Sequence, residues 1–233
     1  MRQTISISAD FFCDGHCYLL TSSSLGGSGL TAEEVQEILF NEDKEATTER
    51  LLKKGVCLPF CFPGDCALDG ATEFVLGDLT EAEERGWMAR LRWKLNVPCG
   101  KLILACGCLA EDLEPALAGE TPDPHYTIFQ VIDVPPDEYL VEIYAFYQSQ
   151  TMQVALDAES DEYDDLDDAE FDEDEYGERL IKVEPKYREY DGAAYIIRLS
   201  PLETEPPLPK TESGWLENFE FREGLNLENG FHT

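Results

Sequence analysis

Short stretches in which apolar and polar residues alternate recur along the chain, and residues that favour turns separate them. Such alternation predicts β-strands, because successive side chains of a strand point to opposite faces. We expect the centre of the core within residues 93–147, where these stretches are clearest. The pattern predicts a mainly β chain of the α+β class, built as an antiparallel β-sandwich with two or three flanking helices. The predicted strands are residues 5–13, 16–21, 56–62, 71–76, 101–105, 126–134, 139–147, 151–156 and 193–199.

The first two strands are expected to form a hairpin around Asp14 and Gly15. Aspartate followed by glycine favours a two-residue turn, because both residues tolerate the positive φ that the turn requires. In such a hairpin Cys13 and His16 would be directly opposed, with Cα atoms about 4.5–5.5 Å apart. Cys17 would then point to the other face of the sheet.

Helix starts are marked by two capping boxes. Thr31 and Thr80 are each followed three positions later by glutamate, so the hydroxyl and the carboxylate can satisfy each other's backbone N–H groups. A further helix is predicted at residues 45–54. We expect the helix after Thr80 to continue through Leu91, and residues 111–124 to form an acidic loop that contains proline.

These elements predict one domain, residues 1–202, because 233 residues of which 43% are hydrophobic can bury one sizeable core. Residues 31–54 are expected as a helical insertion in this domain, and residues 157–178 as an acidic insertion without fixed structure. Residues 203–233 begin with several prolines and are expected to form a tail that docks back onto the domain.

The chain is strongly acidic, with 49 Asp and Glu against 17 Lys and Arg and a formal net charge of −32. Residues 157–178 hold 14 of these acids and no base, yet the rest of the chain still has 35 acids against 17 bases. Such a surface repels nucleic acid and anionic membranes and attracts basic partners. High charge also keeps a protein soluble, and this alternative needs no partner.

The sequence also bears on location. No apolar run reaches the roughly 18 residues that a membrane-spanning helix requires. The N-terminal stretch, residues 1–8, alternates apolar and polar residues and lacks the apolar segment of a signal peptide. We therefore expect a cytoplasmic protein without membrane contact, whose cysteines are mostly thiols or metal ligands and not disulfides.

Aromatic and apolar side chains are interspersed among the acids of residues 161–176. The run is expected to be a solvated loop, since like charges repel and few apolar groups are buried. Alternatively, it captures a basic protein surface, mimics a nucleic-acid backbone toward a nucleic-acid-binding protein, or binds divalent cations weakly. The candidate partner-binding residues are Asp161, Glu162, Tyr163, Asp164, Asp165, Asp167, Asp168, Phe171, Asp172, Glu173, Asp174, Glu175 and Tyr176.

Cysteine and histidine supply the other candidate chemistry. Cys13 and Cys17 are separated by three residues, as are Cys57 and Cys61, and zinc sites use such spacings. Buried thiols that pack as small apolar groups are the alternative explanation. We expect no catalytic residue and no cofactor, because few histidines are placed to activate a nucleophile. If zinc is bound, the candidate ligands are Cys13, His16, Cys57 and Cys61.

Three stretches that follow the N-terminal strand pair carry a resemblance. They begin Trp93-Lys-Leu-Asn-Val-Pro-Cys-Gly, Val134-Pro-Pro-Asp-Glu-Tyr and Tyr195-Ile-Ile-Arg-Leu-Ser-Pro. The layout resembles that of uncharacterised bacterial β-sandwich proteins, and it is distantly similar to competence-associated inhibitors of a DNA-entry nuclease and to immunity proteins. The resemblance implies the sandwich fold and suggests inhibition. It assigns no functional residue, because none of the matching positions is a known site.

Charge, the aromatic residues within the acidic run and this resemblance favour a non-enzymatic acidic binding protein. We expect an inhibitor or immunity-type protein for a basic, nuclease-like partner, with no direct contact to nucleic acid. The alternative is a structural or catalytic metalloprotein that binds zinc through Cys and His. A hydrolase with a carboxylate or Cys–His site is a third hypothesis.

Overall fold

The structure is a computed structural model of the 233-residue chain. It describes residues 2–8, 10–11, 15–65, 68, 72–123, 127–161, 183–223 and 225, and for residues 157–161 the backbone alone.

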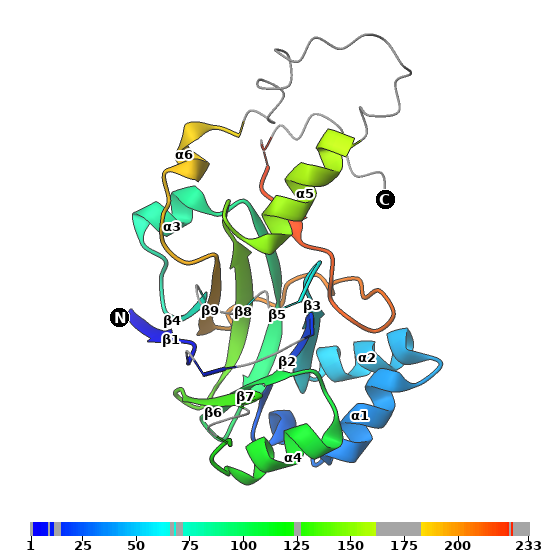
Figure 1. Ribbon diagram of the computed structural model, residues 1–233. Coiled ribbons are helices and arrows are strands. Elements are labelled where there is room, and N and C mark those ends of the chain that lie inside the picture. Colours follow the sequence, from blue (N-terminus) through cyan, green and yellow to red (C-terminus); the bar gives the residue numbers. More distant parts are fainter. Residues whose placement is uncertain are drawn as a thin grey trace.

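Two β-sheets form the centre of the fold (Figure 1). The named strands pair antiparallel, except that β4 and β9 run parallel. The six-stranded sheet has the order β1 (Gln3–Ser6), β4 (Thr72–Leu76), β9 (Tyr195–Pro201), β8 (Asp137–Ala145), β5 (Ala89–Val97) and β10 (Glu220–Phe221). The four-stranded sheet has the order β3 (Cys57–Cys61), β2 (Cys17–Ser22), β6 (Lys101–Cys106) and β7 (Phe129–Asp133).

A β-rich α+β fold is therefore confirmed, with ten strands and six α-helices in the described part of the chain. Both sheets are open, and the parallel pair departs from the expected all-antiparallel arrangement. The helices exceed the two or three expected. They are α1 (Ala32–Phe40), α2 (Lys44–Lys53), α3 (Glu81–Gly86), α4 (Ala110–Ala118), α5 (Gln150–Asp161) and α6 (Pro185–Arg188), with a short 3-10 turn at Leu25–Gly27.

The main core cluster contains side chains from both sheets, including Tyr18 and Leu20 of β2 and Trp93 of β5, each at most 1% exposed. The indole N–H of Trp93 donates to the carbonyl oxygen of Leu52 at 2.8 Å, which ties β5 to the end of α2. Strand alternation explains the division, because Leu19 lies between Tyr18 and Leu20 and faces a second cluster.

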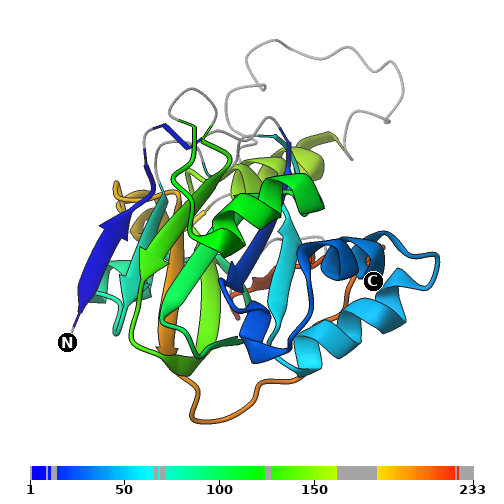
Figure 2. The same ribbon diagram turned by 90° about the horizontal axis from the view of Figure 1, so that it is seen from below.

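The second cluster lies between the four-stranded sheet and the helices α1 and α4. Val35 and Leu39 of α1 and Leu113 of α4 pack there against Leu19 and Ile103 of the sheet. Figures 1 and 2 show α1, α2 and α4 beside this sheet, and Figure 1 shows α3, α5 and α6 at the other end of the molecule. The predicted insertion at residues 31–54 thus folds as α1 and α2 and covers a face of the core.

One buried ion-pair network lies on the six-stranded sheet. Glu142 of β8 is 4% exposed. Its carboxylate oxygens lie 2.8 Å from Nη1 of Arg198 in β9 and 3.3 Å from Nη1 of Arg90 in β5. A buried carboxylate without a partner lowers the stability of a fold, so the two arginines offset the cost of burying Glu142.

Several expected strands form close to their predicted bounds, namely β3, β4, β6, β7, β8 and β9. The prediction that the first two strands form a hairpin is wrong. β1 pairs with β4 in one sheet, whereas β2 lies between β3 and β6 in the other. Asp14 lies outside the described residues. Phe11, which lies between β1 and β2 in the sequence, is buried in the main core cluster.

Three further predictions are corrected. The helix expected to reach Leu91 ends at Gly86, because from Ala89 the residues alternate between core and outer face and form β5. Residues 151–156, expected as a strand, lie in α5, where the hydroxyl of Ser149 accepts the N–H of Met152 as an N-cap does. The expected loop at residues 111–124 begins with α4.

Described residues of the C-terminal tail contact both sheets. Leu216 is buried and forms a bridge beside Phe60 of β3, and the two residues of β10 pair with the start of β5. Among the described residues, no helix has the length and apolar character needed to cross a membrane.

Candidate functional site

A covalent link joins β2 and β3 at one end of the four-stranded sheet. Cys17 and Cys61 are directly opposed in the antiparallel register, with Cα atoms 4.1 Å apart, and their sulfurs form a disulfide. The two residues are brought together because residues 57–61 form a strand that pairs along the whole of β2. Cys61 is 2% exposed, and Cys17 is half-buried.

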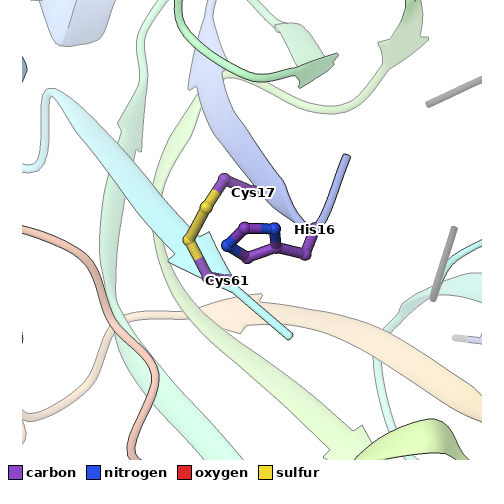
Figure 3. A group of neighbouring side chains, drawn as sticks. All are labelled: His16, Cys17 and Cys61. Carbon is purple, nitrogen blue, oxygen red and sulfur yellow. A yellow bond between two sulfur atoms is a disulfide. The ribbon is translucent and has the colours of Figure 1, made fainter. Parts of the chain in front are cut away.

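His16 lies directly beside this disulfide. Its ring nitrogen and the two sulfurs all lie within 4.8 Å of one another, and Figure 3 shows the imidazole next to the sulfur–sulfur bond. Nδ1 of His16 is 3.5 Å from a carboxylate oxygen of Asp65, four residues beyond Cys61. Burial and the charge of Glu212 raise the pKa of Glu217, and His16 opposes this, so a second carboxyl lies within electrostatic reach of the imidazole.

The predicted zinc ligands do not converge as a set. His16 and Cys61 do lie together, but Cys57 pairs with Thr21 at the far end of β3, about 13 Å along the strand from Cys61. Cys57 is fully buried in the second core cluster. Cys13 lies outside the described residues. Cys17, which was not among the predicted ligands, takes the place beside His16.

The expectation that disulfides would be rare is wrong for three described cysteines, because Cys106 is disulfide-bonded in addition to Cys17 and Cys61. Three others are free thiols. Burial, with Cys108 as a neighbour, raises the pKa of Cys57, and burial raises that of Cys108 to about 12. These two thiols are therefore protonated and unreactive in the folded protein.

The third free thiol, Cys99, is exposed in the turn between β5 and β6. Its sulfur lies 3.2 Å from the hydroxyl oxygen of Ser23. Partial burial opposes ionisation, but hydrogen bonds from Ser23, from Ser24 and from the backbone outweigh it and lower the pKa of Cys99 to about 7. Cys99 is thus the described thiol most easily ionised, and no histidine takes part in its hydrogen bonds.

A separate feature is a groove of about 620 Å³ between α1 and α4. The two helices are fixed to each other because the side-chain oxygen of Gln36 in α1 accepts the N–H of Ala110, the first residue of α4. Leu109 precedes α4 and is 43% exposed at the groove. The lining residues are Glu33, Gln36, Glu37, Leu109, Ala110, Glu111 and Glu114.

The charge of this groove is entirely negative. Its four glutamates, two from each helix, are solvent-exposed, and no ion pair to any of them occurs among the described residues. A larger hollow of about 740 Å³ beside β6 and β7 contains Lys101 as well as Asp133, so it has no single sign of charge. The helix groove therefore suits a cationic side chain with an apolar neighbour.

The predicted partner-binding residues after Asp161 lie outside the described residues, and Asp161 is the last residue of α5. The groove was missed because residues 111–124 were interpreted as a loop. A helical signal was present in the spacing of Leu113, Ala116 and Leu117, and in Gly119, which ends α4 with a φ of 74°.

No family model matches the chain, and neither does any curated protein. A solved structure described as "Crocagin biosynthetic gene J" is similar over 87% of this chain and 96% of its own, with 14% sequence identity and a TM-score of 0.38. A similarity of this degree assigns no function, so a function can be inferred only from the residues of this chain.

Proposed function

We propose that the protein is a non-enzymatic acidic binding protein whose partner presents a basic surface. The observation that carries this proposal is the α1–α4 groove, where four unpaired glutamates surround exposed Leu109. Lysine or arginine side chains would neutralise the carboxylates, and an apolar side chain would cover the leucine. The net charge of −32 adds long-range attraction, which speeds encounter with a basic protein.

The finer part of the proposal is that the protein acts as an inhibitor or immunity-type protein for a nuclease-like partner. Nucleases bind a polyanion and so present basic surfaces, which an acidic protein can occupy in place of nucleic acid. The acidic run at residues 161–176 would extend the same contact. The proposal includes a sandwich-like relation of the two sheets, supported by the core cluster that they share, and it involves neither direct nucleic-acid binding nor a membrane.

The test is a calorimetric titration of the full chain with an amphipathic helical peptide rich in lysine and arginine, at low and at high salt. The informative variant is Glu37→Gln with Glu114→Gln, which halves the negative charge of the groove. Its matched control is Glu203→Gln with Glu223→Gln, two exposed glutamates outside the groove that change the net charge equally. We expect the groove variant to weaken binding at least tenfold and the control less than twofold.

An equal loss in both variants would show that overall charge alone attracts the peptide and would refute the groove as the binding site. A variant that lacks residues 162–178 tests the acidic run in the same titration. The inhibitor hypothesis requires in addition that the protein slows DNA cleavage by a basic nuclease, and that the groove variant slows it less.

Zinc binding through Cys and His is a second candidate function. The approach of His16 to Cys17 and Cys61 favours it, although the ligands differ from the set predicted from spacing.

A further inference from the structure

We infer that the ends of β2 and β3 carry a redox-controlled zinc site. The Cys17–Cys61 disulfide is the form that excludes the metal, and its reduction supplies two thiolates next to an imidazole and a carboxylate. The inference is independent of the basic partner, since these residues are not part of the α1–α4 groove. Three protein groups supply the ligands, namely the sulfurs of Cys17 and Cys61 and a ring nitrogen of His16, and solvent takes the fourth position. The carboxylate of Asp65 contacts Nδ1 of the same imidazole and orients the ring.

The three ligand atoms lie close enough to reach the spacing of a tetrahedral zinc site after reduction. Ligand atoms about 2.0–2.3 Å from zinc lie about 3.3–3.8 Å from one another. A ring nitrogen of His16 and both sulfurs already lie within 4.8 Å of one another. Once the disulfide is broken, rotation of the two opposed cysteine side chains brings the sulfurs to the required spacing.

The oxidation state of Cys17 and Cys61 determines whether zinc can bind, because the same two sulfur atoms form either the disulfide or the bonds to the metal. A dithiol reductant attacks one sulfur of the disulfide, and its second thiol then releases the other, so the reductant becomes a disulfide and the protein gains two thiols. Zinc binding then displaces one proton from each thiol and forms two zinc–sulfur bonds. Reoxidation reverses both steps and expels the metal.

Access and charge also support the site. The side chains of His16 and Asp65 are 55% and 64% exposed, so a reductant and a metal ion can reach the group from solvent. The carboxyl of Glu217 lies within electrostatic reach of His16 and adds negative charge next to the proposed cation. By contrast, the buried thiols of Cys57 and Cys108 lie in an apolar cluster.

The experiment is a zinc titration of the full chain in the oxidised form and after reduction with a phosphine, with cobalt as a spectroscopic substitute. We expect no binding of metal at this site by the oxidised protein. The reduced protein should bind one ion per chain with submicromolar affinity, and cobalt should show sulfur-to-metal charge-transfer absorption. Bound zinc should also slow the reaction of the two thiols with a disulfide reagent.

The decisive variant is His16→Gln, which leaves every cysteine in place and changes an exposed side chain. It should raise the dissociation constant for zinc at least tenfold, and Asp65→Asn should raise it as well. Cys17→Ser should abolish the charge-transfer band, whereas Cys99→Ser and Cys106→Ser should leave it unchanged. Unaltered affinity in His16→Gln, or a band that depends on Cys106 instead of Cys17, would overturn the inference. Peptide titration of His16→Gln shows separately whether the basic-partner site persists.

Discussion

Replacing Cys17, Cys61 or both by alanine removes the covalent link between β2 and β3. The resulting change in the free energy of unfolding shows how much this link stabilises the fold. The Cys17–Cys61 disulfide closes a loop with a sequence separation of 44 residues. In the chain-entropy treatment, a loop of that length reduces the entropy of the unfolded chain by about 13 cal/mol/K, which is about 4 kcal/mol of stability at 25 °C.

Each of the three variants opens the same loop, so their effects should not add. We expect Cys17→Ala, Cys61→Ala and the double variant each to lower the free energy of unfolding by about 4 kcal/mol, which gives a coupling energy of similar size. Buffers without reductant keep the disulfide of Cys106 intact, so only one covalent link differs among the proteins.

The assay is urea unfolding followed by tryptophan fluorescence, to which buried Trp93 contributes, and by far-UV circular dichroism, which should give the same transition. With a urea dependence of about 2–3 kcal/mol/M, the midpoint should fall by about 1.3–2 M. Cys99→Ala removes an exposed free thiol and should change stability by less than about 0.5 kcal/mol. Additive losses, or a loss below about 1 kcal/mol in the double variant, would refute the loop argument.

Three further outcomes are expected. Alkylation of the native protein should occur first at Cys99, and Cys57 should react only after unfolding. The rate at Cys99 should rise with pH as the thiolate forms and reach half of its maximum near pH 7. Mass spectrometry of digests checks the order of reaction. Glu142→Gln should cost about 3 kcal/mol in urea unfolding, because two arginines lose their buried partner, whereas exposed Glu220→Gln should cost less than about 0.5 kcal/mol. Thr31→Ala should cost about 1 kcal/mol, since it removes the hydroxyl that caps α1; Thr31→Ser should keep most of that stability.

Local chemistry in the sequence was sufficient to predict many individual elements. The capping boxes at Thr31 and Thr80 both form with their two reciprocal hydrogen bonds, because the interacting groups are only three residues apart. Strands such as β8 and β9 were found because their core positions are filled by β-branched and aromatic residues. Prediction succeeded where a few adjacent residues fix the backbone.

Strand partners could not be predicted in the same way. The Asp14–Gly15 pair favours a tight turn in the sequence, yet β1 pairs with β4 at the edge of the larger sheet. The parallel pairing of β4 with β9 joins residues more than 120 positions apart, and no local pattern encodes such a choice. Burial of Tyr18, Leu20 and Phe60 against the other sheet determines which strands become neighbours.

The same reason limited the prediction of the candidate sites. Spacing suggested Cys57 and Cys61 as a ligand pair, but residues four apart in a strand are separated by the full length of β3. The actual neighbours, Cys17 and Cys61, face each other only because of the register between β2 and β3. Their juxtaposition is a property of sheet pairing, and the sequence shows it only once that pairing is known.

Helix electrostatics distinguish the glutamates of the acidic groove that stabilise their own helix from those that do not. Glu33 and Glu111 lie in the first turns of α1 and α4, where the helix N-terminus stabilises a carboxylate by about 0.3–1 kcal/mol and so accounts for their presence. Glu37 and Glu114 lie beyond those turns and gain little from this effect. They are exposed and unpaired among the described residues, and they line the same groove. Their carboxylates therefore repel the others in the groove, and no interaction with the helix N-terminus offsets this repulsion. A basic partner would offset the repulsion by pairing with the two carboxylates. Replacing these two residues should therefore weaken binding of the basic peptide without lowering the free energy of unfolding.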